Sequence, residues 1–210
     1  MVVNRVKNLN NKGYTIVELL VATAVFSTVI ITVSVMLVQI SRMYYKGTVL
    51  SKTQNSAREI TEDISNSLKF GSSAVRGDMP IPANATGSFC IGSIRYKYSI
   101  IGVLPVAPTT SALSREKLNN PNADCSVPGS DSKDMLDDNM RINTLYVSRV
   151  TGSSGLYRII VDIVYGEDEL LTSLGSDAET GHNLQSCDGQ VAGSQWCARS
   201  RYETFVSTRL

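Results

Sequence analysis

One acidic side chain lies at the edge of a long apolar run near the start of this chain. Glu18 is followed by twenty-two residues without a charge, Leu19 to Ile40, and is preceded closely by Gly13 and Tyr14. A charged side chain at the centre of a membrane helix costs about 2.5–3.5 kcal/mol on insertion scales, so an acid near lipid usually has a function and a partner. A positive charge a few ångströms away would keep the carboxylate ionised and oriented. Glu18 is therefore a candidate functional residue, and the chemistry that it offers is an ion pair.

The sequence contains few residues from which a catalytic or metal site could be built. Its single histidine, His182, lies in a Gly-rich polar stretch, and there is no Gly-x-Ser-x-Gly motif, phosphate-binding loop or Cys-x-x-Cys pair. The acids Asp131, Asp134, Asp137 and Asp138 do not have the spacing of an EF-hand loop, so a solvated acidic loop is favoured over a calcium site. We expect no enzymatic activity, no cofactor and no metal.

The apolar run is long enough to cross a membrane as a helix. At 1.5 Å per residue, Leu19–Ile40 spans about 33 Å, against a hydrocarbon core of about 30 Å. Residues 1–13, before the run, contain Arg5, Lys7 and Lys12 and no acid, which predicts a cytoplasmic N-terminus and an extracytoplasmic remainder. A secretory signal peptide would have an apolar region of about 7–15 residues and a small-residue cleavage site, which Gln39-Ile40-Ser41-Arg42 lacks.

The segment around Gly13 resembles the class III leader of the type IV pilin and pseudopilin family. Members carry a short basic leader that ends in glycine, then an aromatic residue, and a glutamate at the fifth position of the mature chain. Gly13, Tyr14 and Glu18 stand at these positions, with tyrosine in place of the usual phenylalanine. Over residues 7–40 the resemblance implies cleavage between Gly13 and Tyr14 by the prepilin peptidase and N-methylation of Tyr14. It also implies that Glu18 pairs with the free amine of a neighbouring subunit during assembly.

The resemblance implies a structural function. The chain would be a minor pilin or pseudopilin that enters or primes a type IV pilus or type II secretion filament. Its size of 22.8 kDa and its layout are similar to those of the larger minor pilins of the PilW and type II secretion J kind. Its partners would be other pilin subunits, the prepilin peptidase, the inner-membrane assembly platform and membrane lipid. It would sit as a single-pass protein in the cytoplasmic membrane and then in an extracellular or periplasmic filament.

Two alternatives to a structural filament subunit stay open. The chain could be a filament-tip binding module for adhesion or DNA uptake, or a bitopic membrane-anchored extracytoplasmic domain that keeps residues 1–13. Without residues 1–13 the side chains count 17 basic minus 19 acidic, or −2, which argues against a broadly basic nucleic-acid surface. Small residues in the apolar run suit either close helix packing in a filament or a simple anchor. Binding of DNA or glycans stays undetermined.

The residues after the membrane run predict that the helix continues. From Ser41 to Phe70 there is no proline, and Ala57, Ile60, Ile64 and Leu68 have helical spacing. We expect one nearly continuous helix over residues 14–69, with Gly71 as its C-terminal cap; a break near Gly47 is the alternative. The expected parts are a leader (1–13), a transmembrane and assembly helix (14–40), an amphipathic continuation (41–70) and an extracytoplasmic β-rich domain (71–210).

The composition changes after Gly71, where all six prolines and much Ser, Gly, Asn and Asp occur. Strands are predicted over 94–100, 141–150, 156–165 and 201–209, with a hairpin through the loop 151–155. The stretch 105–138 is expected to be an excursion with few anchors and a short helix near 114–119. An amphipathic helix packed on an antiparallel sheet gives an α+β fold.

Four cysteines lie on the predicted extracytoplasmic side, where an even count favours disulfides. Four cysteines allow three pairings. We expect Cys187 to pair with Cys197, which would close a loop like the C-terminal disulfide loop of many pilins, and Cys90 to pair with Cys125.

Overall fold

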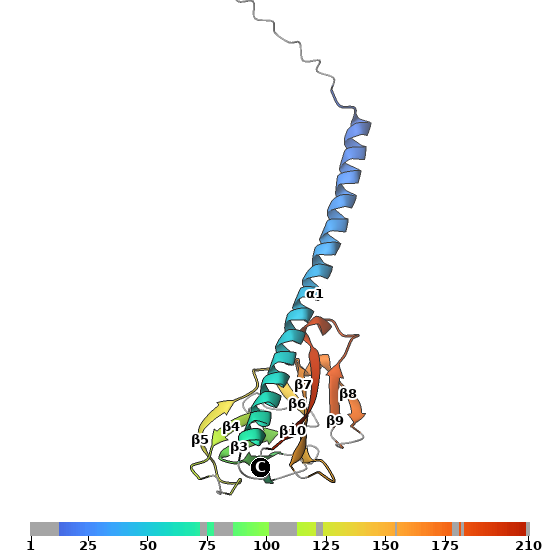
Figure 1. The fold of residues 1–210 in the computed structure, drawn as a ribbon. Helices are drawn as coiled ribbons and strands as arrows, with labels where there is room; N and C mark the ends of the chain where they lie inside the picture. The colour runs from blue at the N-terminus through green and yellow to red at the C-terminus, as the bar shows by residue number, and fades with distance from the viewer. Residues whose placement is uncertain are drawn as a thin grey trace, which may run out of the picture. The chain divides into compact units, whose positions relative to one another are not determined.

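The N-terminal element is a long α-helix, α1 (Ile16–Phe70), of 55 residues (Figure 1). The computed structural model describes residues 13–71, 75–77, 86–100, 113–120, 124–153, 155–177, 181 and 183–208. The helix runs through Gly47 without a break, so the expectation of one continuous helix is confirmed and the two-helix alternative is wrong. The chain divides into two units, residues 1–43 and 44–210, and α1 contributes to both.

The first unit contains the apolar part of α1, in which the side chains point outward. Ile16 is 81% exposed and Ile30 is 47% exposed. The helix is long and apolar enough to cross a membrane, and the window that meets this test has no buried residue. Its apolar side chains therefore have no packing partner among the residues of this chain that the structure describes.

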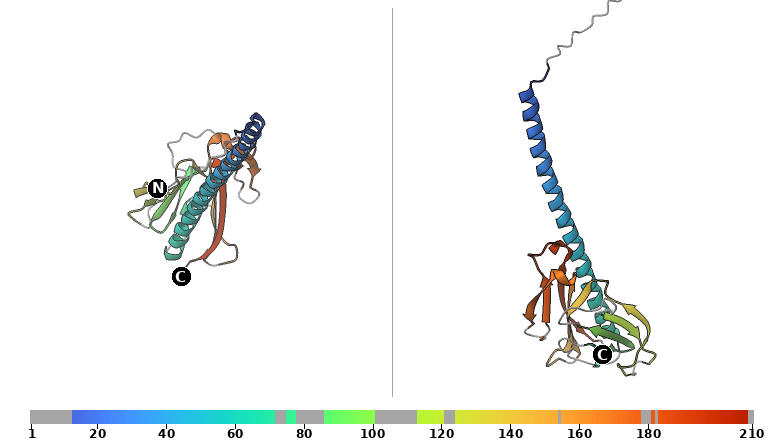
Figure 2. Two further views of the ribbon diagram at one scale, coloured as in Figure 1. Left: turned by 90° about the horizontal axis from the view of Figure 1, so that it is seen from above. Right: turned by 180° about the vertical axis from the view of Figure 1, so that it is seen from behind.

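The second unit contains the part of α1 from Tyr44 onward, which buries one face. Ala57, Ile60, Ile64 and Leu68 are all at most 1% exposed, as their spacing predicted. In Figures 1 and 2 this teal part of the helix runs between the green strands on one side and the orange and red strands on the other. The stripe joins a hydrophobic core with residues from both groups of strands, among them Phe89, Tyr96, Leu145 and Ile163.

The described strands form three antiparallel sheets in the second unit. Within the described residues the first sheet has the order β1 (Arg76–Gly77), β2 (Thr86–Ile91), β3 (Ile94–Ser99), β4 (Leu113–Lys117) and β5 (Ser130–Asp134). The second has the order β10 (Ala198–Ser207), β7 (Leu156–Tyr165) and β6 (Met140–Arg149), and the third pairs β8 (Leu171–Ser176) with β9 (Asn183–Cys187). Two short 3-10 helices are η1 (Asp168–Leu170) and η2 (Ser194–Trp196). The α+β expectation is confirmed.

The strongest strand predictions agree with the structure. Strands β6 and β7 form an antiparallel hairpin through the loop 151–155, of which residue 154 lies outside the described part. Gly152 and Gly155 have φ of 84° and 91°, which lets the chain reverse between the strands. The predicted strand at 94–100 is β3, and the last predicted strand is β10, which begins three residues earlier than expected.

The predicted short helix at 114–119 is wrong, because this segment is strand β4. Ser114, Arg115, Glu116 and Lys117 favour a helix locally, but tertiary pairing overrides this preference. Strand β4 pairs with β3 on one side and β5 on the other. Of the stretch 105–138, the structure describes residues 113–120 and 124–138, and these include the strands β4 and β5.

Gly71 directly follows the last residue of α1, at the helix end where it was expected, but it does not have the positive φ of a left-handed cap. Its N–H donates to the Ser67 carbonyl oxygen over 2.7 Å, which continues the helical pattern. A Cβ at Gly71 would overlap that carbonyl oxygen and lie 3.1 Å from Ile91 Cγ2. Glycine is needed here for close packing at the helix end rather than for a left-handed conformation.

Candidate functional site

The candidate acid, Glu18, closes a hydrogen-bonded ring with Thr15 at the start of α1. The Thr15 backbone N–H donates to Glu18 Oε2 over 2.9 Å, and the Thr15 hydroxyl donates to the same oxygen over 3.0 Å. In return, the Glu18 backbone N–H donates to Thr15 Oγ1 over 3.2 Å. This reciprocal arrangement is a capping box, in which a threonine before the helix and a glutamate three residues later satisfy each other's backbone donors.

The capping box was missed at the sequence level, although its signal was present. Thr15-Ile16-Val17-Glu18 fits the pattern of Ser or Thr followed three residues later by Glu or Gln, just before an apolar run. The carboxylate therefore has a structural role within this chain, in addition to any partner outside it.

The carboxylate of Glu18 retains capacity for another donor. Both bonds from Thr15 end on Oε2, whereas an ionised carboxylate has about four acceptor sites on two oxygens. The cap uses the Thr15 amide, which lies beyond the bond between Gly13 and Tyr14. Cleavage at that bond would leave the cap intact and place a new amine one residue before Thr15.

Gly13 and Tyr14 lie before the helix and are exposed, with Tyr14 at 89%. Among the described residues, a Cβ added to Gly13 would meet nothing within 4 Å. The described part of the fold therefore does not require glycine at position 13. A requirement for glycine there would come from a molecule that binds this segment.

The hydroxyl groups of the apolar helix bond within the helix itself. Thr28 Oγ1 donates to the Val25 carbonyl oxygen over 2.8 Å, and Ser34 Oγ donates to the Ile30 carbonyl oxygen over 2.8 Å. Thr23, Ser27 and Thr32 make the same kind of bond. Because no water is present in a hydrocarbon core, polar groups there must be satisfied internally. The apolar helix meets that condition with its own carbonyls.

Residues 8–34 match the family model described as the prokaryotic N-terminal methylation motif. The matched range contains Gly13, Tyr14, Thr15 and Glu18, and it lies inside the range for which the resemblance was noted. The segment is a leader of the type IV pilin-like kind. The chain matches no curated protein and no solved structure. The methylation motif therefore supports a pilin-like or pseudopilin precursor, and it does not extend into the second unit.

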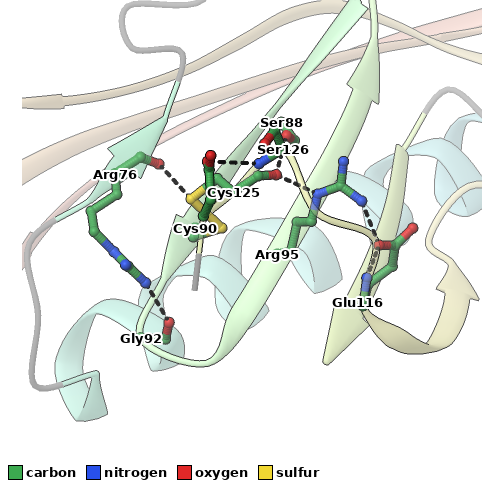
Figure 3. The surroundings of a disulfide bond; sticks show 10 residues. Arg76, Ser88, Cys90, Gly92, Arg95, Glu116, Cys125 and Ser126 are labelled. Atoms are coloured by element: carbon green, nitrogen blue, oxygen red, sulfur yellow. Dashed lines mark hydrogen bonds and ion pairs between the residues drawn. A yellow bond between two sulfur atoms is a disulfide. The ribbon is translucent and has the colours of Figure 1, made fainter. Parts of the chain in front are cut away.

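The first disulfide joins Cys90 on β2 to Cys125, which follows β4, with 5.8 Å between their Cα atoms (Figure 3). The Cys125 carbonyl oxygen accepts hydrogen bonds from Ser88 Oγ over 2.7 Å and Arg95 Nε over 2.6 Å. Arg95 also pairs through NH1 with Glu116 Oε2 over 2.7 Å. The disulfide and Arg95 together hold the segment after β4 against β2 and β3.

The Arg95–Glu116 pair is nearly buried and lies beside this disulfide. The side chains are 10% and 11% exposed, and the Gly129 N–H also donates to Glu116 Oε2 over 2.9 Å. Burial raises the pKa of Glu116, but the Gly129 N–H and the Arg95 guanidinium outweigh it, so the net pKa is lowered. The sequence pattern of β3 and β4 did not indicate that Arg95 and Glu116 would be buried as a pair.

The second disulfide joins Cys187, the last residue of β9, to Cys197, which precedes β10. Their Cα atoms are 5.6 Å apart. The enclosed loop contains η2 and Trp196, whose side chain is 42% exposed. Both disulfides are the pairs that the sequence analysis expected.

The remaining candidate residues that the structure describes do not form a metal site. Among the described residues, no group of three His, Cys, Asp or Glu side chains is placed to hold a metal ion. Asp131 and Asp134 lie on β5, whereas Asp137 pairs with Lys52 Nζ over 3.1 Å. His182 lies outside the described residues.

Proposed function

We propose that this protein is the precursor of a pilin-like structural subunit. It is cut between Gly13 and Tyr14, N-methylated on Tyr14 and assembled into a filament through α1. The observation that carries the proposal is the methylation motif over residues 8–34, placed on an exposed apolar helix. The free space around Gly13 also supports it, because no described residue comes close enough to require glycine there. The proposal gives the protein no catalytic role.

In this proposal the subunit is first a single-pass protein of the cytoplasmic membrane. Residues 1–13 face the cytoplasm and the second unit lies outside. Its partners are the prepilin peptidase, other pilin subunits, the inner-membrane assembly platform and the surrounding lipid. Disulfides are typical of the oxidising side of a membrane, and the second unit contains two among its described residues.

The test of processing is the N-terminus of the native protein, measured by intact mass and terminal peptide sequencing. Cells with and without an active prepilin peptidase provide the comparison. A chain that begins at methylated Tyr14 only when the peptidase is active supports the proposal. A chain that keeps residues 1–13 in both strains would contradict it and favour a bitopic anchored domain.

We assign Glu18 a charge role in assembly that is separate from its capping role. Glutamine also serves in a capping box, so Glu18→Gln removes the charge while it keeps the cap. Thr15→Ala does the reverse, because it removes the capping hydroxyl and keeps the carboxylate. This pair of variants separates the two functions of one side chain.

Both variants should be cut at Gly13 in membranes, and only Glu18→Gln should fail to enter filaments. Filament incorporation is measured as the fraction of processed protein that is recovered in sheared filaments. Thr15→Ala should lose only about 1 kcal/mol of helix stability from its missing cap. Normal incorporation of Glu18→Gln would refute the charge role, and equal loss in both variants would assign the effect to the cap.

Within the pilin-like class, we propose a minor subunit that primes or caps a filament. Two features support this: the size of 22.8 kDa, and a large second unit with three sheets among its described residues. Quantitative mass spectrometry of purified filaments tests this, with a few copies per filament expected. A chain that makes up most of the filament mass would contradict it.

A further inference from the structure

Three aromatic side chains of the second unit, Tyr44, Tyr45 and Trp196, form a contiguous group that we call the aromatic cluster. The Tyr45 and Trp196 ring centroids are 4.3 Å apart, and those of Tyr44 and Tyr45 are 6.0 Å apart. None of the three is buried: Tyr44 is 70% exposed, Tyr45 41% and Trp196 42%. The cluster joins α1 to the C-terminal disulfide loop and leaves much aromatic surface uncovered.

The disulfide loop holds Trp196 in place. Cys197, the next residue, is 2% exposed and is bonded to Cys187 at the end of β9. Gly193 has a φ of 100°, a conformation that glycine adopts readily, and it begins the turn η2. The Trp196 backbone N–H donates to the Gly193 carbonyl oxygen over 2.8 Å. The indole ring is therefore presented on a cross-linked turn rather than on a free tail.

The cluster follows the apolar run closely in the sequence. Tyr44 and Tyr45 come four and five residues after Ile40, which is about 6–8 Å along a helix. Arg42 and Lys46 flank them, and long basic side chains near the end of a membrane helix reach toward the headgroups. Tryptophan and tyrosine are enriched at this same depth, since their rings are apolar and their N–H and O–H groups are polar.

We propose that the aromatic cluster binds the lipid headgroup region of the membrane that α1 crosses. The C-terminal disulfide loop thereby becomes a second point of membrane contact, beside the helix, for the second unit. The inference rests on the proposed insertion of α1 into the membrane and continues that interface. We assign the cluster to a lipid surface because its exposed rings combine apolar area with polar O–H and N–H groups. Basic residues also lie beside it in the sequence.

Other aromatic side chains of the second unit are also exposed. Phe70 is 73% exposed and Phe205 57%, and neither side chain has a polar atom, whereas Tyr202 on β10 is 42% exposed and has a hydroxyl group. Phe70 ends α1, about 39 Å along the helix from Tyr44. Phe70 thus provides a position for a control that is distant from the aromatic cluster.

Trp196 is the only tryptophan in the chain, so its fluorescence reports on the cluster alone. The full chain is reconstituted into vesicles of phosphatidylethanolamine and phosphatidylglycerol that contain a spin-labelled lipid. The label is placed either at the headgroup or near the end of the acyl chain. We expect the headgroup label to quench Trp196 at least roughly twofold more than the deep label, as for an interfacial ring.

The control variant moves the tryptophan to the far end of the helix. Trp196→Phe combined with Phe70→Trp should show emission that neither label quenches. Flotation of the vesicles on a density gradient is measured in the same samples and tests membrane insertion by itself. This variant changes no cysteine, so loss of a disulfide would not explain a change in quenching.

The outcomes separate the inference from the proposed function. Protein that floats with strong headgroup quenching of Trp196 supports both. Protein that floats without quenching, or with stronger quenching by the deep label, overturns the headgroup contact and leaves membrane insertion standing. Protein that does not float overturns insertion and the inference with it. Trp196 that is shielded only in assembled filaments would assign the cluster to a second copy of the chain and overturn the lipid contact.

Discussion

The two parts of α1 are one helix in geometry and two different elements in chemistry. Before Tyr44 the helix exposes its apolar side chains, as Ile30 does at 47%, whereas after it the apolar stripe is closed, as at Ile64 with no exposed surface. Burial of apolar area stabilises at about 25 cal/mol per Å², so the first part gains little within this chain. In the proposed function, its stabilising partner is lipid or other subunits.

The hydrogen bonds of the two parts show the same contrast. Thr28 in the first part and Thr61 in the second both donate to carbonyls of their own helix, over 2.8 and 2.7 Å. Among the described residues, side chains of α1 that bond to a sheet lie in the second part, where Asp63 and Ser67 reach Tyr96 on β3. The described side-chain hydrogen bonds of the first part stay within α1 and its N-terminal cap, whereas those of the second part also connect α1 to a sheet.

The largest expected effect concerns Gly13, before the first part of the helix. Gly13→Val should abolish processing before Tyr14 and leave the unfolding of the second unit unchanged. The reason is that a Cβ at this position meets no described atom of this chain within 4 Å, so we expect the added side chain to disturb binding of the peptidase rather than the fold. Processing is measured by the mass of the membrane-bound chain, and unfolding by denaturant titration in detergent.

Gly47→Ala is the matched control for Gly13→Val. Gly47 lies inside α1 and its added Cβ would also meet nothing within 4 Å. This variant should be processed normally, with helix stability raised by up to about 1 kcal/mol. Normal processing of Gly13→Val would refute the proposed requirement for glycine at the cleavage site.

The next effect compares the two parts directly through one kind of substitution. Ile64→Ala should destabilise the second unit by about 2–5 kcal/mol, because it opens a cavity in a closed core. Ile30→Ala should leave the unfolding midpoint of that unit unchanged, because Ile30 packs on nothing described in the chain. Denaturant unfolding of the full chain in detergent, followed by Trp196 fluorescence, measures both. Equal losses would show that the two parts unfold as one cooperative unit.

Sequence patterns predicted those elements whose signal lies within one segment. The stripe from Ala57 to Leu68 and the alternation of β3, β6 and β7 each repeat with a fixed period, and each appears where it was expected. The capping box of Thr15 was equally local and could have been found from its spacing.

The features that were not predicted correctly depend on residues far apart in the sequence. Strand β4 has the local composition of a helix, and only its pairing with β3 and β5 fixes it as a strand. Likewise, Arg95 and Glu116 look like solvated charges until the fold places them beside Cys125. Local propensity is weak compared with a set of ladder bonds and buried contacts, so tertiary pairing decides in such segments.

The smallest expected effect tests the polar link between the second part of α1 and β3. The Tyr96 hydroxyl donates to Asp63 Oδ2 over 2.6 Å, and Ser67 donates to Tyr96 over 2.8 Å, since the single phenol hydrogen is already used. Burial, with the bond to Asp63, raises the pKa of Tyr96 above its ordinary value. The unfolded chain therefore loses this proton first.

It follows that Tyr96 contributes stability that is fully present below about pH 10, the ordinary pKa of tyrosine, and is lost as the pH rises through the raised folded value. Tyr96→Phe should lower the free energy of unfolding by about 1–3 kcal/mol near pH 8, because Asp63 and Ser67 lose a buried partner. The difference between the variant and the parent should then shrink above pH 10, as measured by denaturant titration at each pH. A difference that stays constant from pH 8 to pH 11 would mean that the phenol does not link the helix to the sheet as a neutral donor.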